Sequence, residues 1–466
     1  MDDEFNFRPV VVEWDERHVR VLKCFLESLE SKGVKYVILK NDNGLPYENH
    51  SKDVDIVIEP GSYQLAAQLL YAAYKENGVN RYKIHRFERL RCWYGMNVDT
   101  RFAIHIDLLE GFLHKGFEMF PFEMMYRYAR KNEHGVYVLD DVFGTVVLLL
   151  HSTICYHTIK DKYATRIAEV YGRSKREMDI LFYQLFPGQA ASVLITLLEQ
   201  GDYEQIAHKG KWFSHQSKKR ILLHHPCLTL RNVMGFFWEK AMRIVIGRDK
   251  YNTFISVHAP DGTGKTTFIR SLSGELGFYF VCDPKDLVRI FHFRPSFLPN
   301  LGAAGEKLGV MKQDTNFTVP HRARPANPLC SFLRMAYYWM DYAVGVSLIL
   351  RRNAQFDKIT LFDRYIYDFL VDPRRARIQL PYRICQCFTK WVKQPRIVFV
   401  LDTDADTIYA RKQELTREEI ERQLAGFKKL SSLGSRVHLL DAAKRPDEIA
   451  RNAMKIVADT FTRKIE

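Results

Sequence analysis

Apolar residues in the first half of the chain follow a helical pattern at both ends and a strand-like pattern between them. Residues 15–31 place apolar side chains at helical spacing, and most of residues 142–243 do the same. This pattern predicts an α+β region followed by a helical segment. The short apolar runs that predict strands in this half are residues 36–39, 53–58 and 104–108.

The second half alternates strand-like and helical runs from residue 253 to the C-terminus. Such alternation predicts an α/β fold with an open sheet. The clearest helical runs are residues 331–350, 405–411 and a last helix that ends near residue 461. The runs that predict strands are residues 254–257, 278–282, 358–362, 396–401 and 436–440.

The changes in pattern divide the chain into domains. With 466 residues it is too long for one ordinary core, so two or three domains are expected. We expect an α+β domain at residues 1–140, a helical domain or linker at 141–247 and an α/β domain at 248–466. The polar residues 247–250 mark the main boundary.

A glycine-rich turn joins the strand at residues 254–257 to the next helix. Glycine lets the backbone take positive φ and approach phosphate oxygens, and the first amides of the helix favour the same anion. A lysine and a hydroxyl in this position would reach the β- and γ-phosphates and a Mg²⁺ ion. The alternative is a solvated turn without a ligand. The turn reads Ala259-Pro260-Asp261-Gly262-Thr263-Gly264-Lys265-Thr266-Thr267, with Ala259 where the usual motif has its first glycine.

Aspartates lie on two of the strands predicted in the first half. Asp53 and Asp55 are two residues apart and therefore share one face of a strand. Asp107 and His105 lie together on the polar face of another strand. Three such carboxylates are the minimum for a two-metal phosphoryl or nucleotidyl transfer site. The alternative is that Asp53 and Asp55 only cap a strand at the rim of the sheet.

A second carboxylate site is predicted in the α/β half. Asp363 follows the strand at residues 358–362, and Arg364 comes directly after it. Open α/β sheets hold their ligands at the carboxyl ends of strands, where Asp363 could organise Mg²⁺ or accept a proton. Loops rich in proline, arginine and histidine, at residues 292–299 and 320–325, are candidates for substrate specificity.

Composition and charge limit the classes of ligand and the cellular location that we expect for this protein. The formal charge of +14 suits acidic ligands, while no base-stacking module indicates specific nucleic-acid binding. The eight cysteines form no C-x-x-C pair, so their spacing indicates neither a zinc site nor a disulfide scaffold. The sequence predicts no secretory signal and no membrane-spanning segment, and we expect a cytoplasmic protein. The basic, histidine-rich residues 208–225 favour a solvated helix face or linker over phosphate or membrane contact.

Two family resemblances extend these predictions. The runs VKYVILKNDNG, DVDIVIEP and IHIDLL, followed by the helix LLLHSTICYHTIKDKYATRI, resemble nucleotidyltransferase-like proteins of the polymerase-β superfamily over about the first third of the chain. The run APDGTGKTT, then Asp363-Arg364-Tyr365, then two arginines in a lid position are similar to the thymidylate kinase family of P-loop kinases.

The kinase resemblance implies a five-stranded parallel sheet with helices on both faces. It also implies ATP and Mg²⁺ as cofactors and transfer of the γ-phosphoryl group to a monophosphate acceptor. The implied acceptor site contains Asp261, Arg364 and Arg294, and the implied lid contains Arg411 and Arg417. The residues implied for ATP are Asp261, Gly262, Thr263, Gly264, Lys265, Thr266 and Thr267, with Thr266 and Asp363 on Mg²⁺.

Several alternatives stay open at this point. The chain departs from thymidylate kinases after its second predicted strand and after Tyr365, which leaves open a sugar or glycan phosphate as acceptor. A fused nucleotidyltransferase and kinase could act together on a surface polysaccharide. The α/β domain could instead be a nucleotide-gated regulator. A homodimer is also left open.

Overall fold

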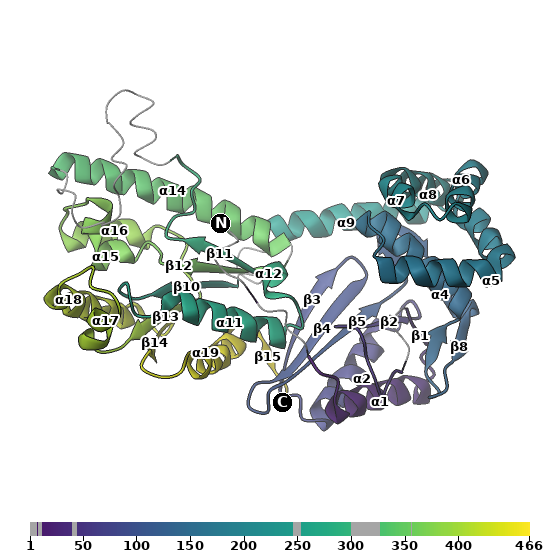
Figure 1. The fold of residues 1–466 in the computed structure, drawn as a ribbon, viewed down its shortest axis with the longest axis horizontal. Coiled ribbons are helices and arrows are strands. Elements are labelled where there is room, and N and C mark those ends of the chain that lie inside the picture. The colour runs from purple at the N-terminus through teal and green to yellow at the C-terminus, as the bar shows by residue number, and fades with distance from the viewer. Residues whose placement is uncertain (1–6, 8–11, 40–43, 246–252, 300–326, 356) are drawn as a thin grey trace. The chain divides into compact units, whose positions relative to one another are not determined.

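The computed structural model describes the chain except for residues 1–6, 8–11, 40–43, 246–252, 300–326 and 356 (Figure 1). It divides into two compact units: Val11–Ala241 together with Arg463–Glu466, and Met242–Thr462. The boundary expected at residues 247–250, and the loop at 320–325, lie outside the described residues. Within the part of the chain that is described, no helix combines the length and apolar character needed to cross a membrane.

The first unit is built on an eight-stranded mixed sheet with the order β15-β3-β4-β5-β2-β1-β9-β8. Neighbouring residues of its inner strands point to opposite faces, and both faces are covered. In β1, for example, Val37 packs into one core while Tyr36 and Ile38 pack into the other. The strands are β1 (Tyr36–Ile38), β2 (Val54–Ile58), β3 (Arg81–Phe87), β4 (Leu90–Asn97), β5 (Phe102–Leu109), β8 (Ala129–Lys131), β9 (Tyr137–Leu139) and β15 (Arg463–Lys464).

Two helices cover one face of this sheet (Figure 1). They are α1 (Glu16–Ser31), which begins at an Asp15 cap, and α2 (Tyr63–Glu76). Asp15 caps α1 because its carboxylate accepts hydrogen bonds from the Arg17 and His18 amides. The apolar side of α1, including Leu22, Phe25 and Leu29, fills the core against the sheet.

The other face packs against helices that follow in sequence. Val57 and Leu109 of the sheet share one continuous core with Phe143, Phe182 and Phe213 of these helices. Residues 141–241 therefore belong to the same unit as the sheet. The remaining elements are β6 (Phe112–His114), β7 (Phe117–Phe120), α3 (Phe122–Arg127), α4 (Asp141–His151), a π-helical turn η2 (Ser152–Tyr156), α5 (Asp161–Leu185), α6 (Gly188–Glu199), α7 (Tyr203–His208), α8 (Gly210–His224) and α9 (Pro226–Val245).

The second unit is an α/β fold with an all-parallel sheet of five strands in the order β11-β12-β10-β13-β14. Consecutive residues of β13 face opposite layers: Val398 and Val400 pack into a core with α14, and Phe399 meets Phe268 of α11. Helices therefore lie on both faces, with α11 and α19 on one and α14 on the other (Figure 1). The strands are β10 (Phe254–His258), β11 (Val288–His292), β12 (Ile359–Asp363), β13 (Ile397–Asp402) and β14 (Val437–Asp441).

Helices of several lengths connect these strands. The longest is α14, which extends the run expected at residues 331–350 at both ends. The set comprises α11 (Lys265–Tyr279), α12 (Pro284–Leu287), α14 (Pro328–Gln355), α15 (Asp368–Val371), the 3₁₀ turn η3 (Pro373–Ala376), α16 (Tyr382–Lys390), α17 (Ala405–Arg411), α18 (Arg417–Lys428), the 3₁₀ turn η4 (Lys429–Leu433) and α19 (Pro446–Phe461).

One predicted strand of this sheet is wrong. Residues 278–282 do not form a strand, because α11 continues through Tyr279 and buries Leu276 and Tyr279 on its inner side. The chain then turns at Val281, where φ is +46°, and enters the sheet only at Val288. A short apolar run does not by itself distinguish the end of a buried helix from a strand.

Candidate functional site

The turn between β10 and α11 has the backbone that its glycines allow. Gly262 and Gly264 take φ values of +88° and +99°, a region that side chains disfavour. A Cβ on Gly264 would meet nothing within 4 Å, so only its conformation requires glycine. A Cβ on Gly262 would lie 3.1 Å from Cβ of Lys412, so here glycine also permits the close approach of the segment after α17.

Lys265 begins α11 and folds back over this turn. Its Nζ donates hydrogen bonds to the carbonyl oxygens of Ala259 and Pro260, at 3.1 and 2.9 Å, and lies 3.4 Å from Asp261. The side chain is buried. Burial, together with the nearby charge of Arg364, lowers the pKa of Lys265 to about 8 against the opposing effect of Asp261.

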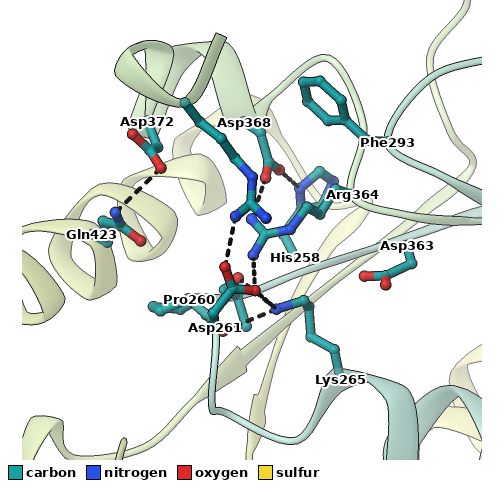
Figure 2. Close-up of polar contacts among 12 residues, drawn as sticks. His258, Pro260, Asp261, Lys265, Phe293, Asp363, Arg364, Asp368, Asp372 and Gln423 are labelled. Atoms are coloured by element: carbon teal, nitrogen blue, oxygen red, sulfur yellow. Dashed lines mark hydrogen bonds and ion pairs between the residues drawn. The ribbon is translucent and has the colours of Figure 1, made fainter. Parts of the chain in front are cut away.

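Asp261 is the acidic centre of a group of cations (Figure 2). Its carboxylate accepts from Arg364 Nη2 at 2.5 Å and from Arg375 Nη1 at 2.7 Å. Burial alone would raise the pKa of Asp261, but the charges of Arg364, Lys265 and Arg375 hold it well below its usual range. Three cations thus lie around one carboxylate, and Asp368 and Asp363 place further negative charge close to them.

A buried chain of hydrogen bonds fixes Arg364. Its Nη1 donates to Asp368 at 2.6 Å, and Asp368 is joined to His258 Nδ1 at 2.7 Å (Figure 2). His258 Nε2 lies 3.1 Å from the Ser256 hydroxyl, so the chain ends within β10. Burial would raise the pKa of Asp368, but Arg364 and His258 lower it to about 2. Arg364 has φ of +72°, so both its backbone and its side chain are held in a restricted conformation.

Asp363 ends β12 at the same edge of the sheet. One of its oxygens lies 3.0 Å from His292 Nδ1 at the end of β11. The other, Oδ1, is buried and has no hydrogen-bond partner within the described part of the chain. Although burial would raise the pKa of Asp363, the His292 bond and the Lys265 charge lower it below its usual value. An ionised, under-coordinated carboxylate is thus presented beside Lys265.

The three threonines of the turn lie in different environments. Thr263 is buried and donates to the Pro260 carbonyl at 2.9 Å, which braces the turn. Thr266 and Thr267 are exposed in the first turn of α11. Their hydroxyls are therefore open to a ligand at the amino end of that helix.

The lid arginines lie away from Asp261. Arg411 ends α17 and is exposed, and Arg417 pairs with Asp406 at 2.9 Å and Glu421 at 3.4 Å at the surface. The residues of this segment that approach the glycine-rich turn are Lys412 and Ile408, which lie close to Gly262. The structure thus places the segment beside the turn without bringing these two guanidinium groups onto Asp261.

Arg294 also lies apart from this group. Its Nε donates to the fully buried Asp341 at 2.9 Å, and Nη2 donates to the Leu298 carbonyl at 3.0 Å. Its guanidinium stacks 5.2 Å from the centre of the Tyr338 ring. Arg294 therefore anchors the loop after β11 to α14 in this structure.

A second group of candidate residues lies in the first unit. Oxygens of Asp53, Asp55 and Asp107 all lie within 4.8 Å of one another, since Asp55 and Asp107 are opposite each other on the parallel pair β2 and β5. Donor atoms of Cys92, His105 and Asp107 lie within the same limit. Burial alone would lower the pKa of His105, but Asp107, 2.8 Å away, raises it above its usual value.

Some of these residues were missed by the reasoning from sequence. Arg375 follows Asp261 by 114 positions, and only the fold brings them together. Cys92 was set aside because it lacks a C-x-x-C partner, yet it lies on β4, directly opposite Asp107. His258 and Asp368 had only a weak signal in the sequence. His258 is a polar residue at the end of an apolar strand, and Asp368 is an acidic residue four positions after Arg364.

Comparison with known proteins adds no assignment. No family model matches this chain, and a search of curated proteins found no match. Its function must therefore be inferred from its residues and their geometry.

Proposed function

We propose that the second unit is an ATP-dependent phosphotransferase of the nucleoside monophosphate kinase type. It would transfer the γ-phosphoryl group of Mg-ATP to a phosphorylated acceptor. The observation that carries this proposal is the convergence of Lys265, Asp261, Arg364 and Asp363 where β10 and β12 end and α11 begins. Parallel α/β sheets bind ligands at this edge, and a helix amino terminus favours phosphate.

The residues present fit Mg-ATP. The backbone of the turn has the positive φ angles that allow amides to face an anion, and Lys265 supplies a cation beside it. Thr266 and Asp363 would hold Mg²⁺, since Thr266 is exposed at the helix terminus and Oδ1 of Asp363 lacks a partner among the described residues. Bound Mg-ATP would supply the phosphoryl group and neutralise part of its charge.

The chain itself would contribute position and charge. Lys265 and the first amides of α11 would stabilise negative charge on the transferring group. Arg364 is buried between Asp368 and Asp261, so it would bind the acceptor phosphate after its Nη2 leaves Asp261. Arg375 adds a second guanidinium beside Asp261. Arg417 would have to leave Asp406 to act as a lid residue, as closing segments of kinases do.

The acceptor is proposed by class only, as a phosphorylated small molecule. The guanidinium groups of Arg364 and Arg375 beside Asp261 are suited to a phosphate, while Arg294 lies apart from them, bound to Asp341. Nucleoside monophosphates and sugar or glycan phosphates share the anionic group that these arginines would recognise. A screen of both classes for ADP release, with and without Mg²⁺, would identify which of them is used.

Replacement of the central lysine tests the proposal. Lys265→Ala should abolish ATP turnover with little change in the thermal transition, because Asp261 keeps Arg364 and Arg375 as partners. Lys285→Ala, which removes an exposed lysine of α12, is the matched control and should keep full turnover. Turnover like that of the wild type in Lys265→Ala would refute the site. If ATP binds but no acceptor yields ADP, a nucleotide-gated regulator becomes the better explanation.

A second candidate function concerns the first unit. The grouping of Asp53, Asp55 and Asp107 within 4.8 Å favours metal-dependent nucleotidyl transfer there. The double variant Asp53→Asn, Asp55→Asn should then stop pyrophosphate release from a nucleoside triphosphate. Pyrophosphate release that persists in this variant would show that the two carboxylates have a structural role.

A further inference from the structure

Strand register aligns donors of different chemistry across the sheet of the first unit. Asp55 lies opposite Asp107 on the parallel pair β2 and β5, and Cys92 lies opposite Asp107 on the antiparallel pair β4 and β5. His105 precedes Asp107 by two residues and shares its face of β5. Oxygen, nitrogen and sulfur ligands therefore meet around one carboxylate.

The distances among three of these side chains suit a single ion. Donor atoms of Cys92, His105 and Asp107 all lie within 4.8 Å of one another, and His105 Nε2 is 2.8 Å from Asp107 Oδ1. A tetrahedral ion bound at about 2.0–2.3 Å holds its ligand atoms roughly 3.3–3.8 Å apart. Small side-chain rotations would therefore bring all three donors onto one ion.

The surroundings would keep the ligands in place. Cys92 is 8% exposed, and the side chains of His105 and Asp107 are 11% and 9% exposed. The His105 ring stacks on Tyr94, with ring centres 4.3 Å apart, which fixes its orientation. Asp107 also belongs to the oxygen group with Asp53 and Asp55, so further carboxylate ligands lie next to the site.

We propose that Cys92, His105 and Asp107 form a binding site for a divalent transition metal of the zinc or cobalt type. Sulfur and imidazole donors select such ions, whereas Mg²⁺ prefers oxygen ligands alone. The site goes beyond the proposed kinase activity and does not depend on it. The competing explanation is structural: the His105–Asp107 hydrogen bond and the Tyr94 stack satisfy a buried polar group without an ion.

Cobalt substitution distinguishes the two explanations, because a thiolate bound to Co²⁺ gives a charge-transfer absorption band in the near ultraviolet. The full chain, freed of metal by chelation, is titrated with Co²⁺ while this band and bound metal are measured. The wild type should bind about one equivalent with the band, and excess Mg²⁺ should leave the band intact. Cys92→Ser should lose the band and weaken Co²⁺ binding by at least about tenfold.

Matched variants keep the experiment decisive. Cys155→Ser is the control, because Cys155 is another cysteine close to a histidine, with its sulfur 3.5 Å from His114 Nδ1. It should retain the band. His105→Gln provides a second test if Cys92→Ser does not fold, and it should weaken Co²⁺ binding similarly. Lys265→Ala should bind Co²⁺ like the wild type, which separates this site from the proposed kinase. No band in the wild type, a band that persists in Cys92→Ser, or displacement by Mg²⁺ would overturn the proposal.

Discussion

The buried pair of Arg364 and Asp368 offers the sharpest test of the network in the second unit. Both side chains are 2% exposed, and Asp368 bonds Arg364 at 2.6 Å and His258 at 2.7 Å. Asp368→Asn would leave the guanidinium of Arg364 with Asp261 as its remaining acidic partner in this network. We therefore expect Asp368→Asn to lower the free energy of unfolding of this unit.

The size of the effect follows from the pKa of Asp368. A fall from 3.8 to about 2 corresponds to about 2 kcal/mol of stabilisation of the charged form. Breaking a buried pair on one side typically costs about 3–5 kcal/mol, because the other charge stays buried. We expect a loss of about 3 kcal/mol, which for a unit of this size lowers the melting temperature by roughly 6–12 °C.

The assay is calorimetry of the full chain, with hydrogen exchange of peptides from β10 and β12 to assign the transition that moves. Asp406→Asn is the control, because it removes an exposed partner of Arg417 and should cost less than about 1 kcal/mol. Since the pKa of Asp368 is lower in the folded state, its stabilisation is present above about pH 4 and is lost as pH falls through 2. The free energies of unfolding of the wild type and of Asp368→Asn should therefore become equal in acid. A loss no larger than that of Asp406→Asn would refute the reasoning.

Two further predictions concern the glycine-rich turn. Because the pKa of Lys265 is about 8, kcat/KM for Mg-ATP should fall as pH rises through 8, and a pH profile that stays flat to pH 10 would contradict this. Gly264→Ala should lower the free energy of unfolding by about 1–2 kcal/mol through backbone strain alone. Gly262→Ala has the same strain and adds a close contact of 3.1 Å with Lys412. Calorimetry should therefore show lower nucleotide affinity and stability in both variants, with the larger loss in Gly262→Ala.

Local sequence was sufficient for the parts of the site that are contiguous in the chain. The turn from residue 259 to 267 joins a strand to a helix as predicted, because its glycines and the apolar run before it act over a few residues. Asp363 likewise ends its strand where the pattern placed it. The two aspartate-bearing strands were also recognised, and the fold makes them neighbours.

The parts that depend on long-range pairing could not be predicted. Strands β3 and β4 form a hairpin whose partly exposed, mixed sequence gave no strand signal, and its register is what places Cys92 opposite Asp107. Arg375 meets Asp261 only through the packing of η3 at the end of the sheet. The strand predicted at residues 278–282 was wrong because an apolar run can end a buried helix as readily as it can form a strand.

The last strand, β15, has a practical consequence for handling this protein. It pairs Arg463 and Lys464 with β3, so the chain leaves the first unit after Ala241 and returns to it after Thr462. Met242–Thr462 is thus inserted in sequence between two segments of the first unit. A purification tag fused after Glu466 would begin two residues beyond an edge strand of the first unit, and isolating Met242–Thr462 would require two cuts.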